Sequence, residues 1–235
     1  YPTEFESEHL WFSDDPDTLK ILLVGDSHTK DIFNAFHLDP VPSPDIEIAR
    51  FGMDRNRVPM EQVETLVASP NFAAADAVAF TARIRSQESV RRLEAAFARL
   101  SETGKPLFLI TNRIEYRGLE DMPLFDWYVR QASGERPADL GKLAYERRDP
   151  RGLEIDAEMR EMALRQGVGL LDQSVLQCDE GRETCSLMTP DGLKMHYDSG
   201  HYTLDGARFI GALAVRSGWL DPLLKGTRQA QMVVE

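Results

Sequence analysis

The feature that most constrains the fold of this chain is a series of short apolar runs separated by amphipathic stretches. Each run is only a few residues long and is rich in Val, Ile, Leu, Phe and Ala. Such runs are typical of strands that are buried on both faces of a parallel sheet. We predict strands at 20–25, 46–52, 76–82, 106–111 and 167–172.

The stretches between the runs have the periodicity of helices. We predict helices at 29–37, 57–68, 86–102, 152–166 and 203–216. In the third of these, Ser86 is the candidate N-cap and Gly104 follows the end. Strands that alternate with helices predict an α/β fold, a three-layer α/β/α sandwich with a central parallel five-stranded sheet.

The length of 235 residues suits one domain, residues 1–235, better than two. Residues 1–18 are polar and acidic, and we predict an irregular lead-in. Residues 113–150 break the strand–helix rhythm with many Gly, Pro and aromatic residues. This insertion follows the carboxyl end of a strand, where ligands bind in open α/β sheets. It is either a substrate-contacting lid or a packed surface excursion with its own aromatic core.

The net charge is −12. An acidic surface argues against nucleic acid and anionic lipid as partners, because both would repel it. No apolar run approaches the roughly 18 residues of a membrane span. The chain begins at Tyr1 without a signal peptide, so we expect a mature form or an excised piece of a longer protein.

The chain has two cysteines, Cys178 and Cys185, in a short polar stretch. Two thiolates do not make a zinc site, and no His-x-x-x-His pattern completes one, so we predict no metal. The cysteines are either free thiols in a cytosolic protein or a disulfide in an extracytosolic one. We favour the disulfide, because a short polar loop with Gly181 at its bend is where a covalent link helps most.

The first strand runs directly into Gly25-Asp26-Ser27. Ser27 therefore lies at the carboxyl edge of the sheet, with the amino end of the following helix close by. The turn is either only a turn or the site of a nucleophile. A serine hydroxyl is a weak nucleophile unless a base takes its proton, so the second interpretation requires a histidine elsewhere.

Five histidines are present, and His28 is poorly placed to bond its neighbour Ser27. Asp198 precedes His201 by three residues, just before the helix at 203–216. At that spacing the carboxylate can accept the Nδ1–H of the imidazole, which leaves Nε2 free to face a serine. The alternative is that Asp198 is a helix cap and His201 a surface residue. The two motifs together favour a Ser–His–Asp relay.

These residues resemble the SGNH (GDSL-type) hydrolases. The resemblance rests on Gly-Asp-Ser at 25–27, Asp-Ser-Gly-His at 198–201 and the element order over about 20–217. It implies that Ser27 is the nucleophile and also gives its backbone N–H to an oxyanion hole. It further implies a second N–H from a glycine after the second strand, which is Gly52 here. The family needs no cofactor, so none is expected.

The third strand departs from that family, which has an asparagine after it as a third oxyanion donor. The segment Ala-Val-Ala-Phe-Thr-Ala-Arg-Ile-Arg offers Thr81 and Arg83 instead, and Asn112 comes one strand too late. Losing one such donor typically costs roughly 10²–10³ in rate. Arg83 is either a cationic donor or substrate-binding group, or an ordinary surface charge.

A narrower resemblance is to the SGNH domains fused behind membrane acyltransferases of the acyltransferase-3 type. It rests on the Gly-Asp-Ser start, the absent asparagine, the paired cysteines and Tyr-Asp-Ser-Gly-His-Tyr-Thr-Leu-Asp-Gly, with Tyr202 and Thr203 where that family has Leu and Ser. Such proteins O-acylate bacterial cell-surface polysaccharides. Plant polysaccharide acetyltransferases share Gly-Asp-Ser and Asp-x-x-His, but their Asp-Cys-x-His-Trp-Cys signature is absent here.

The resemblance implies a periplasmic or extracytoplasmic domain, tethered to the inner membrane through a preceding acyltransferase region of the same full-length chain. Its partners would be an acyl donor or an acylated glycan. The predicted function is serine-dependent acyl-ester chemistry, as an O-acetyltransferase or O-acetylesterase. The alternative is a carbohydrate-binding or interaction module with the fold but impaired chemistry. A nucleotide-binding domain is disfavoured, because no Gly-x-Gly-x-x-Gly or Gly-x-x-x-x-Gly-Lys occurs.

Overall fold

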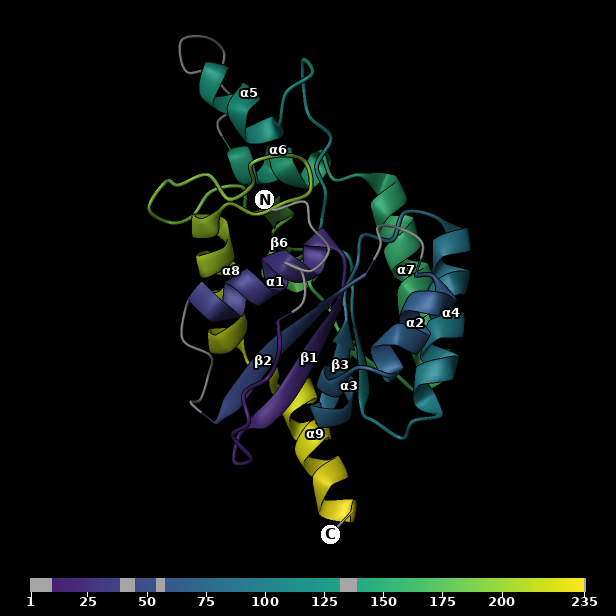
Figure 1. Ribbon diagram of the computed structural model, residues 1–235. Helices are drawn as coiled ribbons and strands as arrows, with labels where there is room; N and C mark the ends of the chain where they lie inside the picture. Colours follow the sequence, from purple (N-terminus) through teal and green to yellow (C-terminus); the bar gives the residue numbers. More distant parts are fainter. Residues whose placement is uncertain (1–9, 39–44, 54–57, 132–138, 235) are drawn as a thin grey trace.

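A five-stranded parallel sheet forms the centre of the computed structural model, which describes residues 10–38, 45–53, 58–131 and 139–234 (Figure 1). The strand order is β2-β1-β3-β4-β5, and every neighbouring pair is parallel. The α/β sandwich predicted from the sequence is therefore confirmed. The strands are β1 (Leu19–Gly25), β2 (Ile46–Gly52), β3 (Ala77–Phe80), β4 (Leu107–Ile110) and β5 (Gly169–Leu171).

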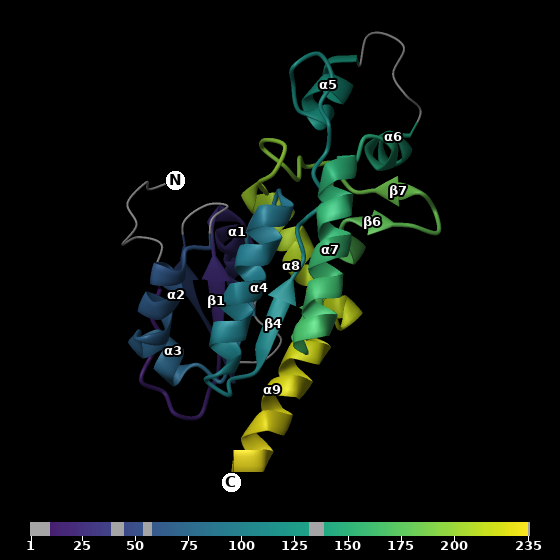
Figure 2. The ribbon, with the colours of Figure 1, turned by 90° about the vertical axis from the view of Figure 1, so that its right-hand side faces the viewer.

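Helices cover both faces of the sheet (Figure 2). One face carries α1 (Ser27–Leu38), α8 (Leu204–Ser217) and α9 (Asp221–Val234). The other carries α2 (Met60–Val67), α3 (Pro70–Ala74), α4 (Gln87–Ser101) and α7 (Pro150–Gln166). Two hydrophobic cores result, because successive side chains of a strand point to opposite faces. Leu22 and Val24 of β1 lie in one core, and Ile21 and Leu23 lie in the other.

The predicted helices are found with small shifts at their ends. Ser86 caps α4, since its hydroxyl accepts the backbone N–H of Ser89. The side chains of Val90, Leu93, Phe97 and Leu100 in this helix are buried. The helix predicted at 57–68 begins at Met60, and residue 57 lies outside the described residues. The helix predicted at 203–216 is α8, and a further helix that was not predicted, α9, follows it. The short helix α3 was also not predicted.

Of the predicted lead-in, residues 1–9 lie outside the described residues. Leu10 forms an isolated antiparallel bridge with Arg50 of β2. The side chain of Asn71 joins this contact by donating to the Leu10 carbonyl oxygen at 2.7 Å. The segment that enters the domain is thus bound to the edge of the sheet before β1 begins.

The insertion forms a third, separate core above the carboxyl edge of the sheet, where α5 and α6 lie in Figures 1 and 2. It contains α5 (Leu124–Arg130) and α6 (Leu140–Glu146), which pack with β6 (Cys178–Asp179) and β7 (Thr184–Cys185). The described part of the insertion thus has a hydrophobic core of its own. Residues 132–138 of this segment lie outside the described residues.

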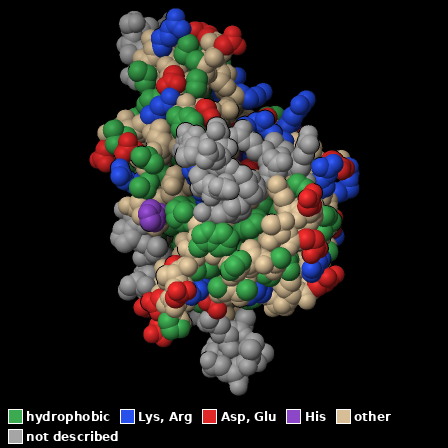
Figure 3. Space-filling model, viewed as in Figure 1, with side chains coloured by type: hydrophobic (Ala, Val, Ile, Leu, Met, Phe, Trp, Pro, Cys, Tyr) green, Lys and Arg blue, Asp and Glu red, His purple; other side chains and the backbone are tan. Residues whose placement is uncertain are grey.

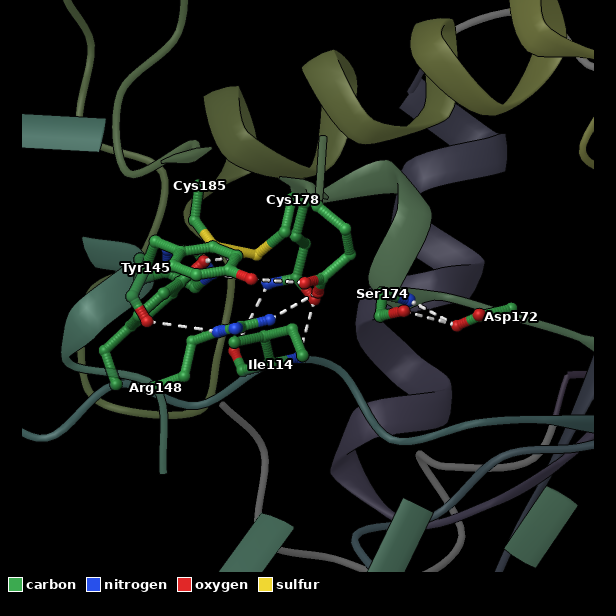
Figure 4. Close-up of a disulfide and its surroundings, with 11 residues drawn as sticks. Ile114, Tyr145, Arg148, Asp172, Ser174, Cys178 and Cys185 are labelled. Carbon is green, nitrogen blue, oxygen red and sulfur yellow. Dashed lines mark hydrogen bonds and ion pairs between the residues drawn. A yellow bond between two sulfur atoms is a disulfide. The ribbon is translucent and has the colours of Figure 1, made fainter. Parts of the chain in front are cut away.

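The predicted disulfide between Cys178 and Cys185 is present and belongs to this third core (Figure 4). Beside it, the guanidinium of Arg148 stacks on the ring of Tyr145, with 3.5 Å between its central carbon and the ring centroid. Glu180 pairs with Arg148 and accepts the hydroxyl of Tyr145 at 2.5 Å. The disulfide therefore joins the two short strands to each other, and the contacts of Glu180 hold the strand pair to the insertion.

Charged side chains of both signs are intermixed on the face shown in Figure 3. On α4 this reflects short-range pairs, in which Glu88 contacts Arg91 at 2.7 Å and Arg92 at 3.0 Å. Exposed pairs of this kind contribute little to stability. They do give this face a mixed surface in spite of the net charge of the chain.

Candidate active site

The turn between β1 and α1 has a backbone that only glycine adopts easily. Gly25 has φ +143°, and a Cβ there would lie 1.8 Å from the carbonyl oxygen of Thr81. The carboxylate of Asp26 then accepts the backbone N–H of His28 at 2.9 Å and that of Arg83 at 3.1 Å. The turn is thereby fastened to the loop after β3, and Ser27 becomes the first residue of α1.

The segment before α8 forms a compact turn around Asp198. One carboxylate oxygen accepts the backbone N–H groups of Gly200 and His201, both at 2.7 Å. The other lies 2.8 Å from Nδ1 of His201. Thr203, not Asp198, caps α8 through its side chain. The carboxylate is therefore free to orient the imidazole.

The two segments meet, although they are 174 positions apart in sequence: Oγ of Ser27 lies 2.9 Å from Nε2 of His201. The meeting follows from the contact between α1 and α8. A Cβ on Gly211 of α8 would lie 1.9 Å from the carbonyl oxygen of Ala35 in α1, so these backbones are in direct contact. The hydroxyl of Ser27, the imidazole of His201 and the carboxylate of Asp198 thus form a continuous chain of hydrogen-bonding contacts.

Two aromatic rings flank the imidazole of His201. Tyr197 stacks on it with 5.4 Å between the ring centroids and 11° between the planes, and His28 meets it edge-on at 5.4 Å. Partial burial would raise the pKa of Asp198. The hydrogen bonds from the Gly200 amide and the His201 ring outweigh burial and hold that pKa below its usual value. The carboxylate is therefore ionised where the imidazole needs a negative partner.

Behind His201 lies a buried cluster that the sequence analysis missed. Nη1 of Arg113 pairs with Asp31 at 2.6 Å, and both side chains are almost fully excluded from solvent. Asp31 also accepts the backbone N–H of Tyr202 at 3.3 Å. Burial and then the charge of Arg113 lower the pKa of His28 well below its ordinary value, so His28 is a neutral ring beside His201.

Of the residues in this cluster, Asp31 could have been found from the sequence. Asp31 follows Ser27 by four positions, so both lie on the same face of α1. Arg113 leaves none, because its place beside α1 is set only by how β4 packs in the sheet.

Gly52 lies at the end of β2, directly beside Gly25 in the parallel register. It is buried, and the next residue, Met53, donates its backbone N–H to the carbonyl oxygen of Gly25 at 2.7 Å. Gly52 thus lies beside the strand end that leads into the turn carrying Ser27. Residues 54–57, which follow, lie outside the described residues.

The guanidinium of Arg83 forms a two-point pair with the carboxylate of Glu115, which Arg85 joins at 3.0 Å. A Cβ on Gly200 would lie 3.2 Å from Nη2 of Arg83, so the pair packs against the Asp198–His201 turn. Arg83 is therefore next to the site, with its charge already matched by a carboxylate. Its predicted role as a substrate-binding group stays a prediction.

Asn112 is engaged in structure rather than exposed at the site. Its side chain accepts the backbone N–H of Ile84 at 2.9 Å and donates to the Ile84 carbonyl oxygen at 2.9 Å. It thus holds the loop after β3 against β4. Its own backbone N–H donates to Asp156 at 3.0 Å.

The buried carboxyl of Asp156 leads to a prediction of how the free energy of unfolding depends on pH. Burial raises the pKa of Asp156 to about 7, while the nearby charge of Arg160 opposes the rise. The unfolded chain releases this proton near pH 4, so the free energy of unfolding should fall by a few kcal/mol, roughly, between pH 4 and 7. The variant Asp156→Asn should lose that decline in chemical denaturation at several pH values. Glu154→Gln, exposed on the same helix α7, is the control, and an equal decline in both variants would contradict the assignment.

The fold and this site define the class of an SGNH-type hydrolase: a parallel α/β sandwich with a serine after β1 and Asp-x-x-His before α8. A family model described as the SGNH domain fused to AT3 domains matches residues 54–216. The chain belongs to this SGNH family.

Solved structures with the same fold include three with low sequence identity. The periplasmic domain of a lipopolysaccharide acetyltransferase from Salmonella ser. Paratyphi A has a TM-score of 0.66 at 13% identity, covering 86% of this chain and 84% of that one. An acetyl xylan esterase has a TM-score of 0.52 at 12% identity, covering 84% and 98%. An α/β hydrolase from the metagenome of Lake Arreo, Spain, has 0.51 at 16% identity, covering 86% and 95%. A comparison with curated proteins gave no match.

The described part of the chain contains no group of three or more His, Cys, Asp or Glu side chains arranged to hold a metal ion. No helix within it has both the length and the apolar character needed to span a bilayer.

Proposed function

We propose that this domain performs O-acyl transfer on a polysaccharide through an acyl-serine intermediate at Ser27. The observation that carries the proposal is the 2.9 Å contact between Oγ of Ser27 and Nε2 of His201, with Asp198 2.8 Å from the other ring nitrogen. This is the arrangement that makes a serine hydroxyl nucleophilic. The fold shared with an acetyltransferase domain and an acetyl xylan esterase supports the same chemistry.

In the first half-reaction, Nε2 of His201 takes the proton of Ser27 as Oγ attacks the acyl carbonyl carbon. The ionised Asp198 stabilises the imidazolium and keeps its ring in place. Collapse of the tetrahedral intermediate breaks the bond to the leaving alkoxide. His201 gives its proton to that oxygen, and the acyl group remains on Ser27 as an ester.

The oxyanion of the intermediate would be stabilised by the backbone N–H groups of Ser27 and Gly52. Ser27 begins α1, where the helix dipole favours negative charge. Gly52 lies on the adjacent strand end. With Arg83 paired to Glu115 and Asn112 bound to Ile84, the site relies on backbone amides for this task.

In the second half-reaction a hydroxyl group attacks the acyl-serine as His201 takes its proton. The bond between the acyl carbon and Oγ of Ser27 then breaks, and His201 returns the proton to Oγ. If the hydroxyl belongs to a sugar the domain is a transferase, and if it belongs to water it is an esterase. The description of the family, a domain fused to AT3 domains, supports an acyl donor supplied by a membrane acyltransferase region of a longer chain. That description and the disulfide support an extracytoplasmic location.

A serine-reactive fluorophosphonate tests the proposal directly. We expect it to label one peptide, the one that contains Ser27, because only an activated serine reacts rapidly with such a probe. Peptide mass spectrometry reads the result, and prior denaturation should abolish labelling. Folded protein that stays unlabelled would favour the second candidate, a carbohydrate-binding module without chemistry, for which the missing third oxyanion donor is the supporting observation.

A further inference from the structure

We propose that the cavity between the insertion and the Asp198 turn binds one uncharged sugar ring of the glycan substrate. This inference rests on the proposed function and deepens it, because it names where the glycan lies. The cavity has a volume of about 380 Å³, within the range of small-molecule sites. It is lined by Tyr116, Gly118, Asp121, Met122, Pro123, Leu124, Phe125, Leu187, His196, Asp198 and Ser199.

One end of the cavity is at the reaction centre. Asp198 and Ser199 belong to the turn that places His201, whose Nε2 contacts Ser27. A ring held there would present its hydroxyl or acyl ester within a few ångströms of that turn. The cavity is therefore a continuation of the catalytic centre toward the insertion, which lies above the carboxyl edge of the sheet (Figure 2).

The walls of the cavity are fixed before any ligand binds. Lys194 forms an ion pair with Asp126 of α5, with both carboxylate oxygens within 2.7 Å of its amine. This pair joins α5 to the segment that leads to the Asp198 turn. The turn that carries Asp121 and Met122 is closed by two hydrogen bonds between Leu119 and Met122, at 3.2 and 3.1 Å. Pre-formed walls reduce the entropy that binding must overcome.

The lining of the cavity combines aromatic and polar groups, as a sugar ring combines an apolar face with hydroxyl groups. A pyranose ring has one face of C–H groups and a rim of hydroxyls. Here Phe125 and Tyr116 supply aromatic surface for the apolar face, and His196, Asp121 and Ser199 supply polar groups for the rim. A purely apolar acyl chain would leave those polar groups unpaired, which is costly.

His196 adds a second, independent observation. It is 4% exposed, and its Nδ1 has no hydrogen-bond partner among the described residues. Burial, and then the charge of Arg113, lowers its pKa to about 3, so the ring is neutral at physiological pH. Its Nε2 lies 3.4 Å from the amide nitrogen of Gln177, a donor, which leaves Nδ1 as the N–H donor. A hydroxyl of a ligand, directly or through one water, would satisfy it.

Charge decides the class of sugar. Both charged residues among the described lining, Asp121 and Asp198, are carboxylates. A uronic acid or a sugar phosphate would be repelled, whereas a neutral hexose or pentose would find acceptors for its hydroxyls. A second cavity of about 380 Å³ near the site differs in this respect, because Arg85, Arg113 and Arg151 line it together with the carboxylates Glu115 and Asp149.

Saturation-transfer NMR with the wild-type domain tests the proposal without any turnover. The probes are the neutral trisaccharides xylotriose, maltotriose and mannotriose, with trigalacturonate as the charged comparison. We expect at least one neutral trisaccharide to bind and trigalacturonate not to bind. Phe125→Ala should weaken binding by about tenfold or more, since it removes the aromatic face.

Val129→Ala is the matched control, because Val129 is exposed one turn further along α5 and does not line the cavity. It should bind like the wild type. Met122→Trp, which narrows the rim, is the second variant if Phe125→Ala proves unfolded by circular dichroism. Failure of all the neutral probes to bind, preference for the charged one, or equal binding by folded cavity variants would overturn the proposal. Fluorophosphonate labelling of the wild type reports the proposed function separately.

Discussion

Ser27→Ala is expected to reduce the rate of aryl acetate hydrolysis by a factor on the order of 10⁴ or more. The loss should be this large because Oγ of Ser27 lies 2.9 Å from the base His201 and is the atom that would carry the acyl group. Without it, the remaining amides can only polarise the ester for attack by water. Steady-state release of the aryl alcohol measures the change in kcat/KM.

The fold of that variant should be intact, since the side chain of Ser27 makes a single hydrogen bond to the described residues, the one to His201. Thermal unfolding by circular dichroism checks this. Ser101→Ala at the far end of α4 is the control, because its hydroxyl bonds only the carbonyl oxygen of Phe97. Ser27→Ala with wild-type rates would show that the hydrolysis occurs elsewhere.

Arg113→Met is expected to lower the free energy of unfolding by about 3–5 kcal/mol, the cost of leaving one member of a buried ion pair without its partner. The side chain of Arg113 is fully buried, and that of its partner Asp31 is almost fully buried. Chemical denaturation measures the loss. Because Asp31 also accepts the backbone N–H of Tyr202, the variant should disturb the position of the neighbouring His201 as well.

The double variant Asp31→Asn with Arg113→Met separates this explanation from a simple loss of packing. Asparagine keeps an oxygen for the Tyr202 amide and removes the unpaired charge. The double variant should therefore be more stable than the sum of the two single losses predicts, by at least about 1 kcal/mol. Additive losses, or a loss below about 1 kcal/mol for Arg113→Met, would contradict a coupled buried pair.

The sheet could be predicted because its strands are buried on both faces and therefore have continuous apolar sequences. Where a run extends into a loop the prediction overshoots: β3 was predicted to reach residue 82 and ends at Phe80. The cause is tertiary, since Thr81 uses its carbonyl oxygen to bind the hydroxyl of Thr29 instead of a neighbouring strand.

Helix α9 was missed because its first half contains Pro222 and Gly226, two residue types that usually interrupt a helical pattern. Its packing depends on Gly226, where a Cβ would lie 2.9 Å from the ring of Phe108 in β4. A glycine in a polar stretch usually indicates a turn rather than a helix contact. Here its lack of a side chain is what allows the helix to approach the sheet.

Some residues of the candidate site could also be predicted from the sequence, and others could not. The sequence motifs were sufficient to predict that Ser27, Asp198 and His201 would be close together, because strand ends and the residues before helices gather at one edge of an α/β sheet. The cluster of His28, Asp31 and Arg113 was not predictable, because it depends on which strands are neighbours. The insertion left two alternatives open; its own core is now established, and a role toward substrate stays a proposal.

The direct contact between Gly211 and Ala35 has a consequence for how the domain could respond to its environment. The helix that carries Ser27 and the helix that follows His201 meet backbone to backbone at this point, and their buried side chains share one core. Movement of the insertion could therefore reshape the approach to the reaction centre and leave the spacing of hydroxyl and imidazole unchanged. Substrate choice and chemical competence would be separable, so that loops could diversify while the proton relay stays constant.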